Sequence, residues 1–576
     1  MVEALSLNQK WVKSAFTGLS EVEKSYLAKQ FDLFYNFALN AVSANPEAQK
    51  REIYEKLIFR KGLVINSSVN TKAFIGNTKD EGIKSLYNKM LEIKKQISDL
   101  YSRTEKERIN SGYNLDSLEE KANAIEKELM KKSSVYKDFV MIPDVKWEDI
   151  RKNLKRDEAI VDFVKFPFFD KKWTELAEFN QNKYAVFITK NDSSKEPAYL
   201  ELKDGNRLDT LTIPALNRAN QEGSRESAVD NDDEKVIDLT AKPDDIPDFY
   251  SELFAPLTKH LKGIKRIYFS LDGEFYKVNF STIKNPLTGK YLIEEYEVVY
   301  ISTPIEMAKN NGKQTPYKTA VMVGYPNYNL ALDSLKTVQT AGETRDVFVN
   351  TGTMKKYDLQ LLPGTKEEAL TTSEILKKNG WDVESLLFEK ATESNVKNVK
   401  APGVLSISTH GYFASSPKAD YKESFFMGTE TKKASENPML RSGLFLTGAE
   451  TFLNSGDDAR SQFPENGILT AFEASQLNLI GTDIVILSAC ETGLGEVNNG
   501  EGVFGLQRGF LGAGAGSVLM SLWKVDDNAT KELMIKFMGK YATGITKPEA
   551  LRLAQLELMR EYPKPYFWGA FVLIGR

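Results

Sequence analysis

Two residues with reactive side chains follow short apolar runs in the second half of this 576-residue sequence. His410 comes two residues after the run VLSIS (404–408), and Cys490 directly follows IVILSA (484–489). The thiolate is the nucleophilic form of cysteine, and a neighbouring imidazole can take up its proton and later donate that proton to a leaving amine. The two residues therefore predict acyl transfer by a Cys490–His410 dyad.

The choice of candidates is narrow because the sequence contains one cysteine and two histidines. The other histidine, His260, lies in the helical context LTKHLKG, and we interpret it as a surface or helix-end residue. Taken alone, Cys490 has the alternative of a buried structural thiol, and His410 that of a capped residue at a strand end. Their occurrence together, at the ends of two predicted buried strands, favours the catalytic interpretation.

A tetrahedral intermediate at such a dyad also needs hydrogen-bond donors for its oxyanion. The backbone N–H groups of Gly411 and Cys490 are suitably placed, and Gly411 has no side chain that would keep a substrate carbonyl away. Losing one donor of this kind typically costs roughly 10²–10³ in rate. We therefore predict an oxyanion hole formed by these two amides.

The elements that would position the dyad alternate between strands and helices after Pro316. Strands are predicted over 319–326, 403–413, 482–493, 516–527 and 568–575, and helices over 366–380, 528–542 and 547–560. This order predicts a parallel or mostly parallel sheet with helices on both faces. Ligands bind beyond the carboxyl ends of the strands in such sheets, so we expect the dyad at that edge.

The part of the chain that begins near residue 145 also has the pattern of short strands. Strands are predicted over 159–166, 183–190, 198–203, 264–271 and 296–302, and a helix over 246–262. The segment 217–236 is polar and nearly free of large apolar side chains, which predicts a mobile loop open to proteolytic nicking. If the protein cleaves itself, this loop is the expected place.

Residues 1 to about 140 show helical periodicity. Apolar side chains recur at helical spacing in two segments, at Ile83, Leu86, Met90, Ile93, Ile97 and Leu100 and at Leu115, Leu118, Ala122, Ile125 and Leu129. The polar stretch 110–112 between them predicts a turn, so the two helices should pair as an antiparallel hairpin.

Composition narrows the class of protein. Three domains are expected from the length of the chain. Lysine and arginine total 76 against 80 for aspartate and glutamate, which argues against a dedicated nucleic-acid-binding protein. The sequence shows neither the apolar core of a signal peptide nor a stretch long enough for a transmembrane helix, so no membrane partner is expected. One cysteine suits a reducing cytoplasm and excludes a multi-cysteine zinc site.

Several longer motifs resemble the CHAT domain, a caspase-like peptidase module that is often fused to tetratricopeptide repeats in bacteria. The matching stretches are LPGTKEEA (362–369), ISTHGYF (407–413), RSGLFLTGAE (441–450), NGILTAFEASQLNL (466–479), the run from LSACETG to DDNAT (487–530), FWGAFVLIG (567–575) and, further upstream, SLDGEFYKVNFSTI (270–283). The resemblance covers roughly residues 145–576, and the dyad of the family falls on His410 and Cys490.

The resemblance implies an α/β fold of the caspase type, with a mostly parallel sheet flanked by helices. It divides the chain into a helical region (1–140) like the end of a repeat array, a degenerate partner domain (141–315) and a catalytic domain (316–576). The partner domain has no cysteine and only the helical His260, so it cannot hold a second dyad.

The resemblance further implies a cysteine endopeptidase that acts through a thioester and needs neither a metal nor an organic cofactor. It suggests a regulated bacterial effector of defence or signalling with a protein substrate. An activating protein or complex would bind the helical N-terminal region, and the isolated chain would have low basal activity.

The strand after the cysteine strand predicts how a substrate is recognised. In caspase-like folds this strand lines the pocket for the substrate residue before the cleaved bond, and here it ends in SLWKVDD (521–527). Asp526 or Asp527 would attract a basic side chain, and Trp523 would pack against the substrate. The alternatives are that Asp527 caps the following helix, with the other aspartate free to bind, and that Trp523 belongs to the core.

A glycine-rich run at 493–505 follows the nucleophile. It lacks the GKS or GKT ending of a phosphate-binding loop, and its glycine spacing differs from that of a dinucleotide fingerprint. We interpret it as a mobile loop beside the nucleophile.

Two other classes of function remain open from the sequence. One is a catalytically silent module that binds a protein partner through the helical region. The other is an α/β hydrolase that acts on an ester or a small amide. Loss of Cys490 labelling on removal of His410 would argue against the first, and cleavage of polypeptides against the second.

Overall fold

The fold was analysed on a computed structural model. It describes residues 1–46, 49–101, 103, 108–109, 111–133, 144–169, 181–202, 204–212, 249–308, 317–331, 357–414, 425–426, 429–430, 437–460, 462–463, 465–490 and 492–575. The segment 217–236, where nicking is predicted, lies outside the described residues, as does part of the polar stretch between residues 414 and 466.

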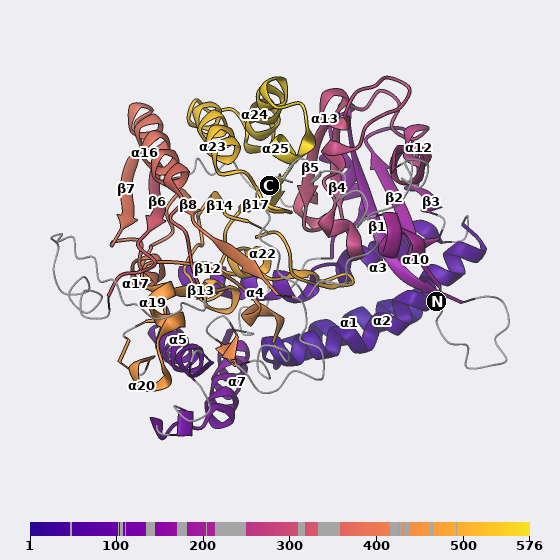
Figure 1. Ribbon diagram of the computed structural model, residues 1–576. Coiled ribbons are helices and arrows are strands. Elements are labelled where there is room, and N and C mark those ends of the chain that lie inside the picture. The colour runs from indigo at the N-terminus through magenta and orange to yellow at the C-terminus, as the bar shows by residue number, and fades with distance from the viewer. Residues whose placement is uncertain are drawn as a thin grey trace.

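Eleven strands form one sheet that crosses the molecule in the order β3-β2-β1-β4-β5-β18-β17-β14-β8-β6-β7 (Figure 1). The strands are β1 (Glu158–Phe168), β2 (Gln181–Lys190), β3 (Ala198–Leu202), β4 (Arg266–Ser270), β5 (Glu297–Ile301), β6 (Thr319–Pro326), β7 (Asp382–Phe388), β8 (Val404–Ser408), β14 (Ile484–Ser488), β17 (Ser517–Ser521) and β18 (Phe571–Gly575). Neighbours are parallel except at β1–β2, β2–β3 and β17–β18. The predicted mostly parallel sheet is confirmed.

The C-terminal strand joins two halves of this sheet. The first half consists of β1 to β5, and the second half consists of β6, β7, β8, β14 and β17. Strand β18 runs parallel to β5 on one side and antiparallel to β17 on the other. The predicted boundary at 315/316 therefore falls between two halves of one continuous sheet.

Smaller sheets are formed by segments that lie in the chain between the large-sheet strands of the second half. One contains β9 (Gly411–Phe413), β12 (Ser442–Phe445) and β13 (Ile468–Thr470) in the order β13-β12-β9. Two strand pairs complete the set, β10 (Phe425–Phe426) with β11 (Thr429–Glu430) and β15 (Glu496–Asn498) with β16 (Gly502–Phe504). Part of the glycine-rich run after Cys490 is therefore a β-hairpin rather than an open loop.

The helical region contains α1 (Val2–Phe16), α2 (Glu21–Ala44), α3 (Lys50–Arg60), α4 (Leu63–Asn77), α5 (Glu81–Tyr101) and α7 (Leu115–Ser133). Its first three helices cover one face of the first half, whereas α5 and α7 pack against Leu440 and Phe472 of the second half. Tyr54 of α3 stacks on Phe187 of β2 with ring centroids 4.4 Å apart, inside a core shared by these helices and strands. Helices α5 and α7 form the predicted antiparallel hairpin, because Ile97 near the end of α5 packs in one cluster with Leu118 near the start of α7.

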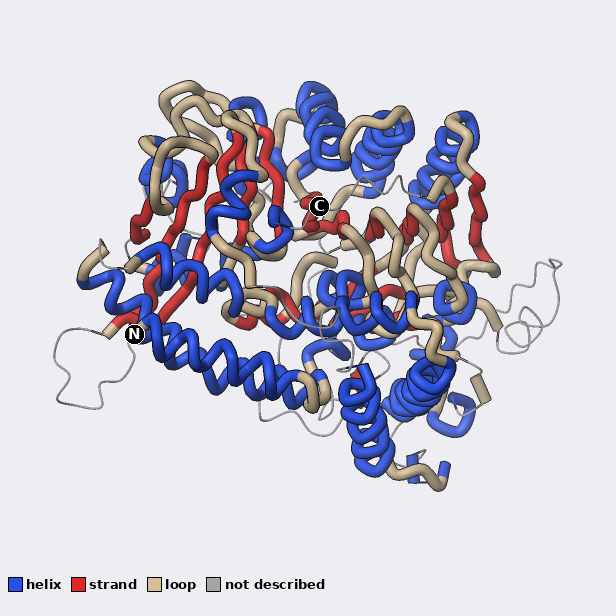
Figure 2. Tube along the Cα trace, turned by 180° about the vertical axis from the view of Figure 1, so that it is seen from behind, coloured by secondary structure: helices blue, strands red, loops and turns tan. Residues whose placement is uncertain are grey.

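Other helices flank the second half of the sheet. Figure 2 views the molecule from behind and shows the strands lying between helices. These helices are α16 (Pro363–Lys378), α17 (Glu393–Lys397), α19 (Ala449–Asn454), α20 (Asp457–Arg460), α21 (Ala471–Ala474), α22 (Leu506–Gly512), α23 (Asp527–Ala542), α24 (Lys547–Glu561) and α25 (Pro565–Trp568). Helices α16, α23 and α24 lie together beyond one face of the second half (Figure 1). Four of the five buried residues of β14 belong to one apolar core that extends into the first half, which matches a strand covered on both faces.

Short helical elements connect the strands. They are α9 (Trp147–Lys152), α10 (Gly205–Arg207), α12 (Ala255–Thr258), α13 (Leu292–Glu295), α14 (Ile305–Ala308), 3₁₀ turns at Gly273–Lys277, Phe280–Thr282 and Pro438–Leu440, and π-helical turns at Leu208–Thr212 and Tyr250–Phe254. The helix predicted over 246–262 is thus shorter in its described part, which consists of the second π-helical turn and α12. No helix in the described part of the chain is long and apolar enough to cross a membrane.

Candidate active site

The two candidate catalytic residues leave the sheet side by side. Strands β8 and β14 are parallel neighbours, and Ser408 is the register partner of Ser488. His410 and Cys490 each follow two residues later, so they stand at the same level beyond the sheet. The N–H of Thr409 donates a hydrogen bond to the carbonyl of Ser488 at 3.2 Å, which continues the ladder past the last strand residues. Both His410 and Cys490 are half-buried.

Gly411 packs directly against the Cys490 segment. A Cβ atom added at Gly411 would lie 2.9 Å from the carbonyl oxygen of Cys490 and 3.0 Å from Cγ2 of Thr492. Real Cβ atoms do not approach a backbone oxygen this closely without a shift. The glycine beside His410 is therefore required for the close approach of the two strand ends.

The imidazole of His410 is oriented by a backbone carbonyl. Its Nε2 lies 2.7 Å from the carbonyl oxygen of Gln360. A carbonyl oxygen only accepts hydrogen bonds, so Nε2 carries the ring proton in the neutral side chain and Nδ1 has the free lone pair. This tautomer leaves Nδ1 as the ring nitrogen that can accept a proton.

Tyr328 packs against the ring of His410 and binds its backbone. Its ring centroid lies 5.4 Å from that of His410, and its hydroxyl accepts a hydrogen bond from the N–H of His410 at 3.4 Å. The hydroxyl is also 2.8 Å from Oγ1 of Thr409, which itself donates to the carbonyl of Phe445. Because Thr409 has one hydroxyl hydrogen, Tyr328 is the donor in their contact. Burial raises the pKa of Tyr328 to about 12, so the phenol keeps its proton.

The small sheet around β12 fixes the backbone of His410. The N–H of Phe445, at the end of β12, donates to the carbonyl of His410 at 2.9 Å. Strand β9 begins at Gly411 and pairs antiparallel with β12. The RSGLFLTGAE and NGILTAFEASQLNL motifs, which contain β12 and β13, therefore belong to the support of the candidate base.

Burial favours the neutral form of the His410 side chain. Burial lowers the pKa of His410, and the carbonyl of Gln360 and the carboxylate of Asp527 oppose that shift. A neutral imidazole is the form that can accept a proton from a thiol. Burial raises the pKa of Asp527, while its hydrogen bond from the N–H of Gly364, 2.9 Å long, acts in the opposite direction.

The three residues predicted for substrate recognition have different roles in the structure. Asp526, not Asp527, is the N-cap of α23, and its carboxylate accepts a hydrogen bond from the N–H of Ala529 at 2.8 Å. Asp527 is half-buried and close enough to His410 to influence its pKa. Trp523 is fully buried, and its indole N–H donates to the carbonyl of Tyr566 at 3.2 Å. Trp523 is therefore a core residue, which is the second of the two alternatives given above.

Tyr566 is a neighbour of the thiol that the sequence did not indicate. Burial, then Asp526, then Cys490 raise its pKa. Asp526 and Cys490 therefore both act electrostatically on the Tyr566 hydroxyl.

The hairpin that follows the nucleophile is held by the two other parts of the chain. At its tip, the carbonyl of Gly500 accepts a hydrogen bond from the N–H of Gly62 at 2.7 Å, and the N–H of Gly500 donates to Asp272 at 2.7 Å. The guanidinium of Arg60 donates to the carbonyl of Asn499 at 3.0 Å. The corner between α3 and α4 and the loop after β4 therefore meet at this hairpin.

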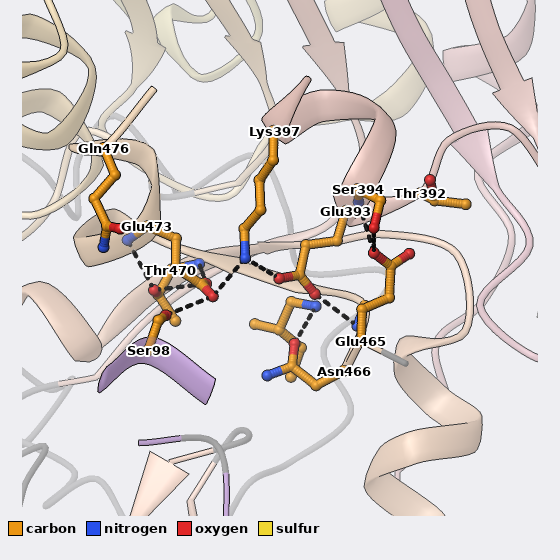
Figure 3. A network of polar contacts seen from close by, with 12 residues as sticks. Ser98, Thr392, Glu393, Ser394, Lys397, Glu465, Asn466, Thr470, Glu473 and Gln476 are labelled. Atoms are coloured by element: carbon orange, nitrogen blue, oxygen red, sulfur yellow. Dashed lines mark hydrogen bonds and ion pairs between the residues drawn. The ribbon is translucent and has the colours of Figure 1, made fainter. Parts of the chain in front are cut away.

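A second contact joins the helical region to the second half (Figure 3). Ser98 of α5 donates to Glu473 of α21 at 2.7 Å. The ammonium of Lys397 lies between Glu473, at 2.8 Å, and Glu393. Burial raises the pKa of Glu393 to about 8, and Lys397 opposes this shift. The network ties α5 to the β13–α21 segment.

Among the described residues, no group of three or more histidine, cysteine, aspartate or glutamate side chains is arranged to hold a metal ion. The glycine-rich run also forms no phosphate-binding loop, since its central part is the β15–β16 hairpin.

Two curated proteins are similar to part of this chain. Tetratricopeptide repeat protein 28 of Mus musculus is 25% identical over 336 residues, and the protein of the same name from Homo sapiens is 24% identical over 333 residues. In each case the match covers 56% of this chain and 12% of the relative. The chain thus spans about an eighth of the length of these relatives.

Two solved structures show a distant likeness. The Saccharomyces cerevisiae separase–securin complex gives a TM-score of 0.40 at 10% identity, covering 100% of this chain and 40% of that chain. The Arg-specific cysteine proteinase gingipain R gives a TM-score of 0.33 at 9% identity, covering 56% of this chain and 65% of that chain.

The family itself is identified by sequence. The profile of the CHAT domain matches residues 247–576, which is more than half of the chain and includes β4, β5 and the whole second half. Both candidate residues, with the strands that carry them, lie inside this match. The chain therefore belongs to the CHAT domain family.

Proposed function

We propose that this protein is a cysteine endopeptidase in which Cys490 is the nucleophile and His410 is the general base. One observation carries the proposal: β8 and β14 are parallel neighbours in register, with Gly411 packed on the backbone of Cys490. A thiol and an imidazole that each follow a paired strand end by two residues can come within reach of each other, and acyl transfer requires that proximity.

Each residue has a defined role in the proposed reaction. Nδ1 of His410 takes the thiol proton, and the Cys490 sulfur attacks the carbonyl carbon of the substrate. The amides of Gly411 and Cys490 would stabilise the oxyanion. The imidazolium then donates its proton to the leaving amine, which leaves a thioester that water hydrolyses with His410 again as base. No cofactor is needed for these steps.

Substrate selection is assigned to the aspartates after β17. The carboxylate of Asp527 acts electrostatically on His410, and Asp526 and Cys490 both act on Tyr566. Either carboxylate would favour a basic side chain in the substrate residue before the cleaved bond. The buried Trp523 supports the wall of this site from the core rather than by contact with substrate.

Regulation is assigned to the helical region. The corner at Arg60–Gly62 contacts the hairpin that follows Cys490, and α5 contacts α21 through Ser98. A protein that binds these helices and shifts them would move the segment next to the nucleophile. We therefore propose an activating partner, with low turnover by the isolated chain and a role as a regulated effector.

The direct test is labelling of the thiol by a peptide that carries an electrophile. Because the chain has one cysteine, covalent labelling reports Cys490 alone. We expect labelling of the parent protein to be lost in His410→Ala and retained in the matched control His260→Ala, which removes the other histidine.

A peptide-library digest compares the parent with Cys490→Ala by mass spectrometry. Cleavage products present only with the parent support the endopeptidase, and products from residues 217–236 would reveal self-processing. Turnover of small esters without any peptide cleavage would identify a different hydrolase. Equal labelling of the parent and His410→Ala, with no turnover of either substrate class, would point to a silent interaction module instead.

A further inference from the structure

A buried carboxyl group bridges the two strands of the proposed dyad. Glu368 is 2% exposed, and its two oxygens lie within hydrogen-bond distance of the hydroxyls of Ser408, at 2.5 Å, and Ser488, at 2.8 Å. These serines are the register partners that end β8 and β14. Each lies two residues before a member of the dyad, so one side chain holds both strands where they leave the sheet.

Helix α16 is built to place this carboxyl group. Strand β6 has Gly324 opposite Ser408, and a Cβ atom there would lie 3.0 Å from the carbonyl of Thr365 and 3.1 Å from Cβ of Ala369. The glycine therefore lets α16 pack closely on the sheet. At the start of the helix, Asp527 accepts the N–H of Gly364, in space that a side chain on Gly364 would fill. The LPGTKEEA motif supplies Gly364, Thr365, Glu368 and Ala369 of this arrangement.

The carboxyl group of Glu368 is unusual for a buried bridge because no cation is among the groups that shift its pKa. Burial raises the pKa of Glu368 to about 8, hydrogen bonds from the two serines oppose the shift, and Asp527 adds to it. At neutral pH the carboxyl is largely protonated, and in that form Glu368 is itself the donor in one of its two serine contacts. A neutral bridge joins the strands without placing a negative charge beside the thiolate, which such a charge would disfavour.

We propose that Glu368 is a positioning residue for the dyad, which holds the ends of β8 and β14 together through Ser408 and Ser488 so that the imidazole meets the thiol. The proposal rests on the proposed function of His410 and Cys490. Glu368 touches neither side chain and acts through the backbone of the two strands. A misplacement of about 1 Å in a reacting pair can cost on the order of 10²-fold in rate.

The test measures the rate of Cys490 alkylation by iodoacetamide as a function of pH in the full chain. A single cysteine makes the rate specific to this thiol, and its dependence on pH gives the pKa of the thiol in each variant. In the parent, the rate at pH 7 should exceed that of His410→Ala, because the imidazole stabilises the thiolate. If these two proteins react alike, the proposed function fails before Glu368 is considered.

We expect Glu368→Ala to lower the rate at pH 7 by roughly tenfold and to raise the thiol pKa towards that of His410→Ala. Glu368→Gln keeps a neutral group that can both accept and donate, so its rate should stay within about twofold of the parent. Glu158→Gln is the matched control, a buried carboxyl of the first half whose partners are Arg266 and the N–H of Lys155, and it should react like the parent.

Two results would overturn the inference while the dyad stands. One is a folded Glu368→Ala protein with the parent's rate and thiol pKa. The other is a Glu368→Gln protein whose alkylation rate falls as far as that of Glu368→Ala, since a neutral bridge would then be insufficient. Should Glu368→Ala fail to fold, the double variant Ser408→Ala/Ser488→Ala decides, because it removes both contacts and should show the same tenfold loss.

Discussion

The two halves of the sheet hold a central pair of parallel strands together in different ways. In the first half, the last register pair of β1 and β4 is Asp162, in the middle of β1, and Ser270, the last residue of β4. The ammonium of Lys61 reaches Asp162 at 2.6 Å and the carbonyl of Ser270 at 3.2 Å. In the second half the equivalent pair is Ser408 and Ser488, bridged by the carboxyl group of Glu368 rather than by a cation.

The two bridges stabilise different parts of the molecule. The lysine of the first half comes from the corner after α3, so this edge anchors the helical region to the sheet. The next residues also serve structure, since Asp272 accepts the N–H groups of Lys165 at 3.0 Å and Gly500 at 2.7 Å. In the second half, His410 and Cys490 follow the bridged serine pair by two residues each. The cation of the first half thus anchors the helical region, whereas the carboxyl bridge of the second half lies next to the candidate site.

The Lys61–Asp162 ion pair should contribute more to the free energy of unfolding than the Glu368 bridge does, and Lys61→Met tests this. The side chains of Lys61 and Asp162 are 5% and 1% exposed, and the substitution leaves the aspartate buried without its cation. Removal of one partner from a buried pair typically costs about 3–5 kcal/mol. We expect a loss of that size in the free energy of unfolding, measured by urea denaturation.

Two variants check the cause of that loss. Lys146→Met removes an exposed lysine whose ammonium lies 3.4 Å from Glu55, and it should cost at most about 1 kcal/mol. Lys61→Met combined with Asp162→Asn removes the uncompensated charge and should recover at least half of the lost stability. If the double variant is as unstable as Lys61→Met alone, lost packing rather than a buried charge explains the effect.

The bridge of the second half should make the free energy of unfolding depend on pH between pH 5 and 8. Burial raises the pKa of Glu368 from 4.5 to about 8, so the carboxyl holds its proton more tightly in the folded state. Its contribution to stability is fully present below pH 4.5 and is lost as the pH rises towards 8. Between pH 5 and 8 the parent should lose roughly 3 kcal/mol more than Glu368→Gln.

The measurement is a pair of urea denaturation series, one for each protein, at several pH values in that window. All other titratable groups are common to both proteins, so their contributions cancel in the difference. Parallel curves would mean that Glu368 has similar proton affinity in the folded and unfolded states, which would contradict a desolvated carboxyl at this position.

The sequence predicted the strands of the sheet well because buried parallel strands are short apolar runs between turn signals. The segment 319–326, predicted as a strand and a turn, forms β6, and the predicted strand 183–190 lies within β2. The order of the strands could not be predicted. Strands β8 and β14 are neighbours although β9 to β13 lie between them in the chain, and β18 inserts between β17 and β5. Such pairings depend on packing between distant segments.

The candidate site was predicted unevenly for the same reason. His410 and Cys490 have reactive side chains next to apolar runs, which is a local signal. Gln360 acts through its carbonyl, and Tyr328 and Glu368 act through contacts across the sheet, so their residue types alone gave no sign of a role. The LPGTKEEA motif was recognised only as part of a resemblance, since no spacing shows that Glu368 reaches two serines.

The smallest expected effect concerns Asp526, where capping and substrate recognition can be separated. Its carboxylate caps α23, and an asparagine oxygen can accept the same hydrogen bond from Ala529. Asp526→Ala should therefore cost about 1 kcal/mol in the free energy of unfolding, and Asp526→Asn a few tenths at most. If Asp526 also attracts a basic substrate side chain, Asp526→Asn will lose preference for such peptides in the library digest at nearly unchanged stability. A preference that survives in Asp526→Asn but disappears in Asp527→Asn would assign recognition to Asp527.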